Sequence, residues 1–352
     1  MGAAHPVRNP PREEVAPSPP AIEPPSRAVS ALSPGPEPRA VSLNARAELP
    51  LEAAAGRPQQ PGAILSALAG LWRFARRKPL GTIGGVIVIA MLVMAAFAER
   101  IAPYGYDETI RGARMQPPSL VHPLGTDNLG RDLWSRIVYG ARVSITVGFL
   151  TVLLGIAGAA AIGISSGYFG GTYDLVVQRI VDAWMSFPFF MIALSVMAVL
   201  GPGLGNVVFS IAIVVAAASS RVVRGATIGV VQNSYVEAAR AMGAGHPRII
   251  ARYIVPNVMT TIIILATIGL GGVILAESAL SFLGFGVPPP HPSWGGMLSG
   301  SGRTNMYRAP WMAIWPGAAI SLAVFGFNML GDALRDVLDP RMRGPGHGAP
   351  GS

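Results

Sequence analysis

Residues 80–98 read LGTIGGVIVIAMLVMAAFA, an uncharged apolar run of 19 residues. Because a helix rises about 1.5 Å per residue, roughly 20 apolar residues are enough to cross the hydrocarbon core of a bilayer. Four basic residues come directly before the run: Arg73, Arg76, Arg77 and Lys78. An excess of basic residues marks the cytoplasmic side of a span. The stretch therefore predicts a transmembrane helix whose first residues face the cytoplasm.

The same stretch has a second interpretation as an export signal, because the small residues Ala96 and Ala98 resemble a cleavage site. The apolar core of an export signal is about 7–15 residues long, which is shorter than this run. Its length therefore favours a span that is retained in the protein.

Working outward from this run, five further apolar stretches predict spans at about 143–165, 183–200, 207–219, 258–276 and 311–330. The third contains Pro188, which a membrane helix tolerates when neighbouring helices satisfy the freed carbonyl. The fourth is the shortest, and we expect it to continue past Ser220. Gly155, Ala159 and Gly163 recur at helical spacing in the second stretch and predict a close helix contact there.

The composition agrees with an all-α membrane protein. Of the 352 residues, 51% are hydrophobic and 13% are charged, about half the charged fraction of a soluble domain. The absence of cysteine excludes disulfides and thiolate metal sites, and the five scattered histidines do not predict a metal site. We expect no cofactor, no metal and no nucleic acid partner.

The spans carry no sign of chemistry of their own. The sequence has no phosphate-binding loop for ATP, and the middle of each proposed span lacks Asp, Glu, Lys and Arg. All five histidines lie outside the spans, which argues against an intramembrane serine protease. We therefore expect a non-catalytic chain that is not a proton-coupled carrier.

Three regions follow from the distribution of proline and charge. Residues 1–62 hold 14 of the 32 prolines and balance six arginines with six acids, which predicts a disordered cytoplasmic tail. Residues 63–343 form the expected transmembrane domain, and 344–352 form a flexible C-terminus. Six spans return the chain to the side on which it starts, so both termini are expected in the cytoplasm. The long connection at 99–142 is then external.

The connection between the fourth and fifth spans carries the strongest local signal, NSYVEAARAMG at residues 233–243. Its arginines outnumber its one acid, Glu237, which predicts a cytoplasmic position. Ser234 and Glu237 fit a capping box at the start of a short helix that ends near Met242. Gly243 suits the left-handed residue that ends a helix.

A second short helix is expected after this glycine. Pro247 fits its first turn, and the helix is predicted to reach about Tyr253. Two short helices with a bend between them form a rigid projection. Such a projection is either a docking element or a well-folded turn.

This connection resembles the EAA loop of permease subunits of ABC importers. Glu237, Ala238, the Gly243 that follows, and an apolar block that ends at Pro256 carry the resemblance. The block reads YIVP at 253–256, where the family pattern prefers Ile first and Leu third. The resemblance implies a coupling helix that inserts into a separate ATPase subunit. It carries over Glu237, Ala238 and Gly243 as coupling residues. The expected coupling loop also includes Ser234, Ala239, Arg240 and Pro256.

Two further stretches resemble dipeptide, oligopeptide and nickel permeases. They read HPLGTDNLGRD at 122–132 and ESALSFLGFGVPPP at 277–290. With GDALRD at 331–336, the match is closest to the C-type subunit and covers about 70–343. The resemblance implies the six-helix transmembrane domain of a type I ABC importer, located in the cytoplasmic (inner) membrane among membrane lipids.

The same resemblance implies partners and a mechanism. The partners are a homologous permease subunit in a heterodimer, two ABC ATPase subunits and an extracytoplasmic solute-binding protein. The implied activity is ATP-driven import of dipeptides or oligopeptides by alternating access. Import of nickel or another small solute is the first alternative, and a freestanding secondary carrier is the second.

Several residues outside the loop have two interpretations. Asp127 or Asn128 caps an amphipathic helix that carries Leu129 and Leu133 on one face, and this helix either packs at the outer interface or contacts the substrate-delivering protein. His122 and Asp127 supply only two ligands, too few for a closed metal site.

Glu277 lies just beyond the fifth predicted span. It either caps the short helix that follows or lines an outer gate, and the sequence favours neither. Trp294, Trp311 and Trp315 fit an interfacial aromatic belt.

Overall fold

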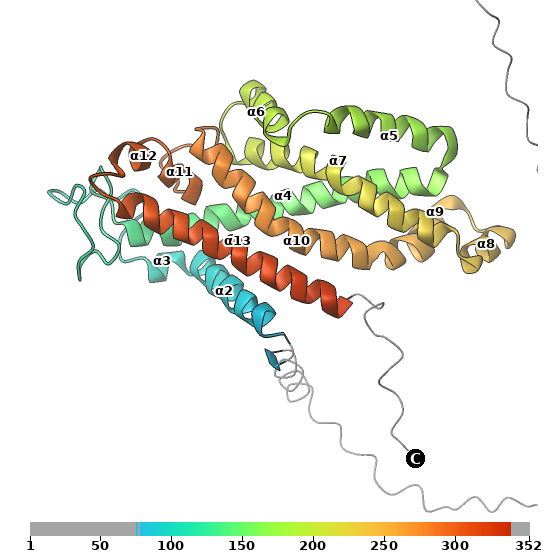
Figure 1. Cartoon of the computed structure of the whole chain (residues 1–352), viewed down its shortest axis with the longest axis horizontal. Coiled ribbons are helices and arrows are strands. Elements are labelled where there is room, and N and C mark those ends of the chain that lie inside the picture. The colour runs from blue at the N-terminus through green and yellow to red at the C-terminus, as the bar shows by residue number, and fades with distance from the viewer. Residues whose placement is uncertain (1–74, 77, 339–352) are drawn as a thin grey trace, which may run out of the picture. The chain divides into compact units, whose positions relative to one another are not determined.

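The computed structural model describes residues 75, 76 and 78–338. The proline-rich region 1–62 and the C-terminal region 344–352 lie outside the described residues. The regular structure of the described part is helical (Figure 1). Its helices are α2 (Pro79–Ala96), α3 (Ala98–Ile101), α4 (Leu133–Phe169), α5 (Gly171–Met185), α6 (Phe189–Leu200), α7 (Leu204–Val231), α8 (Ser234–Ala241), α9 (His246–Ile249), a π-helical segment (Ile250–Ile254), α10 (Val255–Phe282), α11 (Trp294–Leu298), α12 (Ser301–Asn305) and α13 (Trp311–Leu338).

Five helical stretches of the described chain are long and apolar enough to cross a membrane, and the pair α5 and α6 brings the number to six when it is counted as one span. The prediction of one continuous third helix is wrong, because these two helices meet at an angle of 87°. Pro188 stands at the start of α6. Proline disfavours helical backbone at the residue before it, which explains why the chain breaks there.

The helices α4, α7, α10 and α13 are longer than their apolar runs predicted, whereas α2 is close to its run in length. The second predicted span begins ten residues earlier, at Leu133, and the fourth runs to Val231 as part of α7. Arg221 and Arg224, which follow the fourth predicted span, therefore lie on α7. The predicted separate helix at 247–253 is also wrong, because the π-helical segment joins α9 directly to α10. Polar residues at the end of a helix form the same backbone hydrogen bonds as apolar ones, but they do not lengthen the apolar run. A helix can therefore be longer than the run that predicts it.

The helices α4 and α7 form the centre of the bundle. Within their most apolar stretches 50% and 56% of the residues are buried inside the chain, compared with 28% for α2. A Cβ atom added at Gly163 would lie only 2.6 Å from the carbonyl oxygen of Ser220. Gly155 and Ala159 are buried on the same helix. The predicted close contact through small residues is therefore confirmed.

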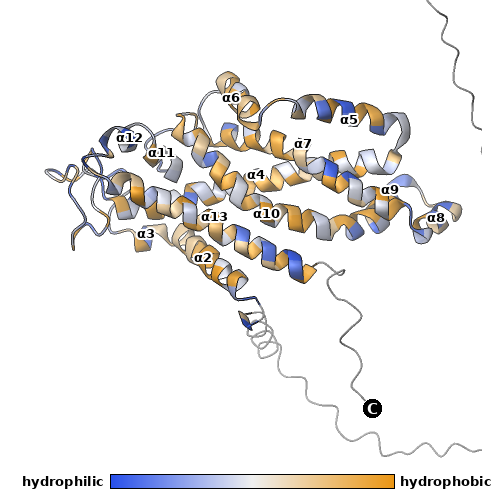
Figure 2. Cartoon of the chain, viewed as in Figure 1, coloured by the Kyte–Doolittle hydropathy of each residue, from blue (hydrophilic) through white to orange (hydrophobic). Residues whose placement is uncertain are grey.

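The helix α2 covers the bundle on the α13 side (Figure 1). Its outward side chains, such as Leu80, Ile83 and Val86, are exposed and apolar. Figure 2 shows hydrophobic residues along much of α2, α4 and α7. An ion pair joins Lys78, just before α2, to Asp336 near the end of α13. The start of α2 and the end of α13 therefore lie next to each other, at the same end of the bundle.

Candidate functional site

The segment 233–254, called the elbow below, projects at one end of the bundle (Figure 1). Its first helix, α8, follows α7 after a break of two residues. Asn233 precedes α8, and its side-chain amide donates to the carbonyls of Gly229 and Val230 at the end of α7, both at 3.0 Å. The elbow thus begins as a direct extension of α7.

The predicted capping box of Ser234 and Glu237 is wrong. Ser234 is the first helical residue instead of the cap, and α8 has no side-chain cap at its N-terminus. The amide of Glu237 donates to the backbone carbonyl of Asn233. A capping box needs its serine one position earlier, outside the helix.

Gly243 ends α8 as predicted. Its φ is +80°, in the left-handed region that favours glycine. Its amide donates to the carbonyl of Arg240 at 2.9 Å, and the next amide, of Ala244, donates to the carbonyl of Ala239 at 3.0 Å. These bonds satisfy carbonyls at the helix end and turn the chain towards α9.

An apolar contact fixes α8 to the bundle. Val236 and Ala239 are 0% and 1% exposed, and Val236 belongs to a buried cluster with Ile249, Ile254 and Val223 of α7. Burial of these side chains holds the elbow against the ends of α4 and α7. Ala239 is thus an inward-facing anchor, whereas the other predicted residues of the elbow are exposed: Ser234, Glu237, Ala238, Arg240 and Gly243.

Polar and aromatic contacts tie the elbow to the end of α4. The hydroxyl of Tyr168 lies 2.7 Å from Nδ1 of His246, and the guanidinium carbon of Arg240 lies 5.3 Å from the centre of the Tyr168 ring. Sequence reasoning missed Tyr168 and His246. No local signal joins these residues, because they lie 78 positions apart in the chain.

The outward surface of the elbow carries exposed apolar side chains among polar ones. Met242 is 78% exposed at the tip, and Tyr235 is 41% exposed. Pro256 lies beyond the elbow, in the first turn of α10, and is also exposed. The outward surface of the elbow therefore combines single apolar side chains with polar ones.

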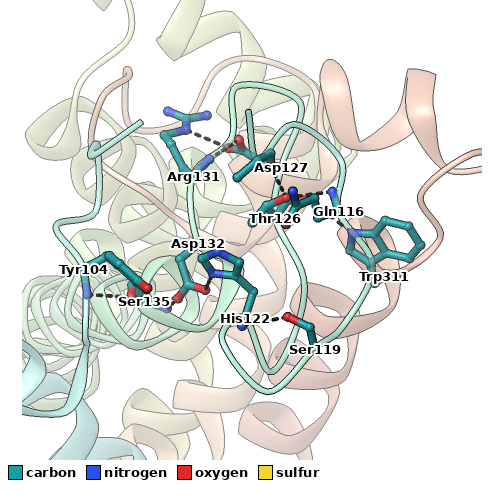
Figure 3. A network of polar contacts seen from close by, with 11 residues as sticks. Tyr104, Gln116, Ser119, His122, Thr126, Asp127, Arg131, Asp132, Ser135 and Trp311 are labelled. Carbon is teal, nitrogen blue, oxygen red and sulfur yellow. Dashed lines mark hydrogen bonds and ion pairs between the residues drawn. The ribbon is translucent and has the colours of Figure 1, made fainter. Parts of the chain in front are cut away.

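A different construction occupies the opposite end, where the segment 102–132 meets α11 and α12 (Figure 1). Asp132 caps α4 by accepting the amide and the hydroxyl of Ser135, both at 2.8 Å. Its other oxygen lies 3.0 Å from Nδ1 of His122 (Figure 3). The side chains of Asp132 and His122 are 0% and 6% exposed. The hydroxyl of Ser135 donates to Asp132 instead of His122, so these residues do not form a serine protease relay.

The predicted cap at Asp127 or Asn128 is therefore wrong. Leu129 lies in a loop and is 43% exposed, so the amphipathic helix expected there does not form. Asp127 instead accepts the amides of Leu129 and Arg131, at 2.8 and 2.9 Å. Asp127 thus stabilises the turn before α4. The sequence predicted a helix cap because both a cap and a turn use the side-chain carboxylate as an acceptor of backbone amides.

The prediction that Trp294 belongs to an interfacial aromatic belt is also wrong. This side chain is 0% exposed, and its indole nitrogen donates to the carbonyl of Ile137 at 3.0 Å. The indole of Trp311 donates to the carbonyl of Thr126 at 3.1 Å, which joins α13 to the segment 102–132. Trp315 is half-buried against the core.

Glu277 lies within α10 and is 0% exposed. Its carboxylate accepts a hydrogen bond from Ser281 at 2.7 Å and lies 3.4 and 3.5 Å from the hydroxyls of Ser278 and Ser144. It does not cap a following helix, because α10 continues through it to Phe282. The outer-gate assignment stays a prediction.

Apolar helices long enough to cross a bilayer, with a structured polar elbow at one end, define a membrane-spanning helical bundle. The family described as the binding-protein-dependent transport system inner membrane component matches residues 159–344. The N-terminal transmembrane domain of oligopeptide transport permease C matches residues 66–118. The chain therefore belongs to the family of inner membrane components of binding-protein-dependent transport systems.

Two sequence relatives agree with this assignment. The dipeptide transport system permease protein DppC of Alkalihalophilus pseudofirmus is 41% identical over 276 residues, which cover 77% of this chain and 90% of the relative. The glutathione transport system permease protein GsiD of Escherichia coli O6:K15:H31 is 39% identical over 279 residues, which cover 78% and 90%. A solved methionine ABC transporter, MetNI, in inward-facing conformations matches with 18% identity and a TM-score of 0.47, over 59% of this chain and 97% of that chain.

Proposed function

We propose that this chain is a permease subunit of an ATP-driven importer that carries peptides across the inner membrane. The observation that carries the proposal is the elbow, an exposed, glycine-ended helix fixed to the ends of two central helices. The substrate class follows from relatives named for dipeptide and glutathione transport. Because glutathione is itself a small peptide, both relatives are named for the transport of small peptides. They therefore favour a peptide over nickel as the substrate. Membership of a binding-protein-dependent family favours this proposal over a freestanding carrier.

The elbow couples the membrane helices to a separate ATPase subunit in this proposal. Ser234, Glu237, Ala238 and Arg240 present the docking face, and Gly243 sets the bend. Ala239 anchors this face to the bundle, and Pro256 lies in the first turn of α10, the helix that transmits the movement of the elbow to the bundle. Movement of the elbow pulls on α4 and α7, because Val236 packs with residues of both helices. The result is a rigid-body change between inward-open and outward-open arrangements.

The proposed assembly contains a homologous permease in a heterodimer, two ATPase subunits and an extracytoplasmic solute-binding protein. Exposed apolar side chains on α2, α5 and α6 are available to lipid or to the second permease. The chain itself is non-catalytic, and ATP is hydrolysed by the ATPase subunits. Its termini lie in the cytoplasm with the elbow, and the segment 102–132 faces outward. Glu277 then lies near the outer end, at the proposed gate.

Replacing Glu237 tests the coupling role. In the complete assembly, Glu237→Ala removes an exposed carboxylate from the docking face, and we expect ATP hydrolysis stimulated by the loaded binding protein to fall at least tenfold, together with peptide uptake. The matched control is Glu108→Ala, which removes an exposed carboxylate from the opposite end. Unchanged stimulation and uptake in the Glu237 variant would contradict the coupling role, provided that the assembly is intact by size-exclusion chromatography.

The orientation has its own test, because the chain contains no native cysteine. A cysteine at Met242, whose side chain is 78% exposed, gives a unique label at the tip of the elbow. We expect an impermeant maleimide to label it only from the cytoplasmic side. Labelling only from outside the cell would invert the topology and remove the proposed contact with the ATPase.

A further inference from the structure

The end of the bundle opposite the elbow contains a cavity of about 370 Å³. This volume lies in the range that accommodates small ligands. Two arginines and one carboxylate line it, Arg131, Arg136 and Asp127, and the proline-rich turn at 288–290 forms part of its wall. The side chains of Val287, Met297 and Met312 add apolar surface. The cavity thus combines a charged part with an apolar wall.

Among the described residues that line the cavity, the two arginines exceed the one carboxylate by one positive charge. The side chains of Arg131 and Arg136 are 15% and 9% exposed, and that of Asp127 is 6% exposed. Asp107 acts on Arg136 from a distance, but it is an exposed residue that does not line the cavity. Positive charge that is largely shielded from water favours the binding of a balancing anion.

The bonding of the two arginines shows where an anion would be held. Nε of Arg131 donates to Asp127 at 2.7 Å, and among the described residues neither of its two terminal nitrogens has a hydrogen-bond partner. Figure 3 shows these nitrogens turned away from Asp127. Arg136 uses one terminal nitrogen for the carbonyl of Tyr106 at 2.8 Å, and its Nε lies 3.8 Å from Asp127. Arg131 therefore presents two adjacent donors without a partner.

We propose that this cavity is an entry subsite that binds the terminal carboxylate of a peptide. A guanidinium with two free donors matches a carboxylate in a bidentate pair, which is both strong and directional. The apolar wall accommodates a peptide side chain beside that pair. The peptide substrate and the outward orientation of the cavity rest on the proposed function. The choice of a carboxylate as the bound group rests on Arg131 and the residues around it.

The test uses the complete assembly of this chain, the second permease and the ATPases in lipid nanodiscs, without binding protein or ATP. Ser299 lines the cavity, and Ser299→Cys places the chain's single thiol there. The rate of alkylation by N-ethylmaleimide is followed by the mass of this chain. The probes are dialanine, which has a free carboxylate, and dialanine amide, which has none. We expect dialanine to slow alkylation at least fivefold and the amide to leave the rate unchanged.

Variants of Arg131 separate its donors from its charge. Arg131→Gln should raise the dialanine concentration for half-protection at least tenfold. Arg131→Lys keeps a positive charge beside Asp127, and therefore the turn that Asp127 shapes, but it loses the two paired donors of the guanidinium. We expect the dialanine concentration for half-protection to rise by a smaller factor, several-fold. Arg111→Gln is the matched control, because Arg111 is exposed and does not line the cavity. Size-exclusion chromatography checks that each assembly is intact.

Several results would overturn the proposal: no protection by dialanine, equal protection by its amide, or half-protection unchanged in either Arg131 variant. A second arm adds the ligand-free binding protein without dialanine. If that protein alone protects the thiol and dialanine does not, the binding protein covers the cavity and the peptide subsite is wrong. Uptake by the wild-type transporter is measured separately. Absence of ATP-driven peptide uptake contradicts the proposed function, whereas normal uptake without protection contradicts only the subsite.

Discussion

The two ends of the bundle are held together in different ways. At the α11 end, buried polar groups connect segments that are distant in sequence, as Trp294 does to Ile137 and Trp311 does to Thr126. At the elbow, a small apolar contact centred on Val236 carries α8, and the outer face of that helix is exposed. Hydrogen bonds between distant segments hold the α11 end together as one unit, whereas the burial of apolar side chains is the main contact that holds the elbow.

This difference teaches what each end can do. Removing one partner of a buried polar pair leaves the other without compensation, so damage at the α11 end should spread through the bundle. The elbow has fewer buried groups, so damage there should stay local. An exposed helix with a firm base suits a contact that transmits movement. Three substitutions test this comparison, in order of decreasing expected effect.

Asp132→Ala should have the largest effect. It removes the cap of α4 and the partner of buried His122, and we expect a loss of about 3 kcal/mol or more of global stability. Asp132→Asn keeps an acceptor for the helix start and should lose less. Thermal unfolding of the purified assembly measures both. A melting temperature unchanged by Asp132→Ala would show that the buried network does not hold this end together.

Val236→Ala should have an intermediate and local effect. It removes two buried methyl groups beneath α8, worth about 2 kcal/mol with the cavity that remains. We expect the amides of α8 to exchange their hydrogens roughly thirtyfold faster, while the melting temperature of the assembly stays unchanged. Glu237→Ala, on the exposed side of the same helix, is the control. A matching fall in global stability would contradict the local character of the elbow.

Gly243→Ala should have the smallest effect of the three. Apart from the two neighbouring residues, no atom of the described chain lies within 4 Å of the added Cβ, so the cost comes from placing alanine at φ +80°. That cost is about 1 kcal/mol, which predicts roughly fivefold faster exchange at the end of α8. Hydrogen exchange followed by mass spectrometry measures it. Exchange equal to that of the unmodified chain would show that α8 does not need the left-handed residue.

Sequence reasoning worked where a signal was continuous or strictly local. The apolar runs located the helices that cross the bundle, the small residues around Gly163 predicted the contact between α4 and α7, and Gly243 predicted the end of α8. The loop pattern around Glu237 and Gly243 led to the correct family. Each of these features depends on neighbouring residues or on a fixed helical period.

The failures share one cause. Trp294 fits an interfacial belt by composition, but it is buried because Ile137, 157 positions away, offers its carbonyl. Asp127 and Asp132 are both suitable caps, and the buried His122 beside Asp132 distinguishes them only in the folded chain. Pro188 was expected to be tolerated within one continuous helix, but the chain bends between α5 and α6. The sequence does not show whether neighbouring helices will satisfy the carbonyl that a proline leaves free.

The sequence by itself determined the membrane class, the number of apolar stretches and the family, since each is encoded by composition, period or a short motif. Only the tertiary structure decided which face of α8 is exposed, how deeply Glu277 is buried and that Arg131 lines a cavity with two donors that have no partner among the described residues. These properties depend on which distant segments meet. Burial and hydrogen bonding are therefore set by the packed chain, and local sequence does not carry them.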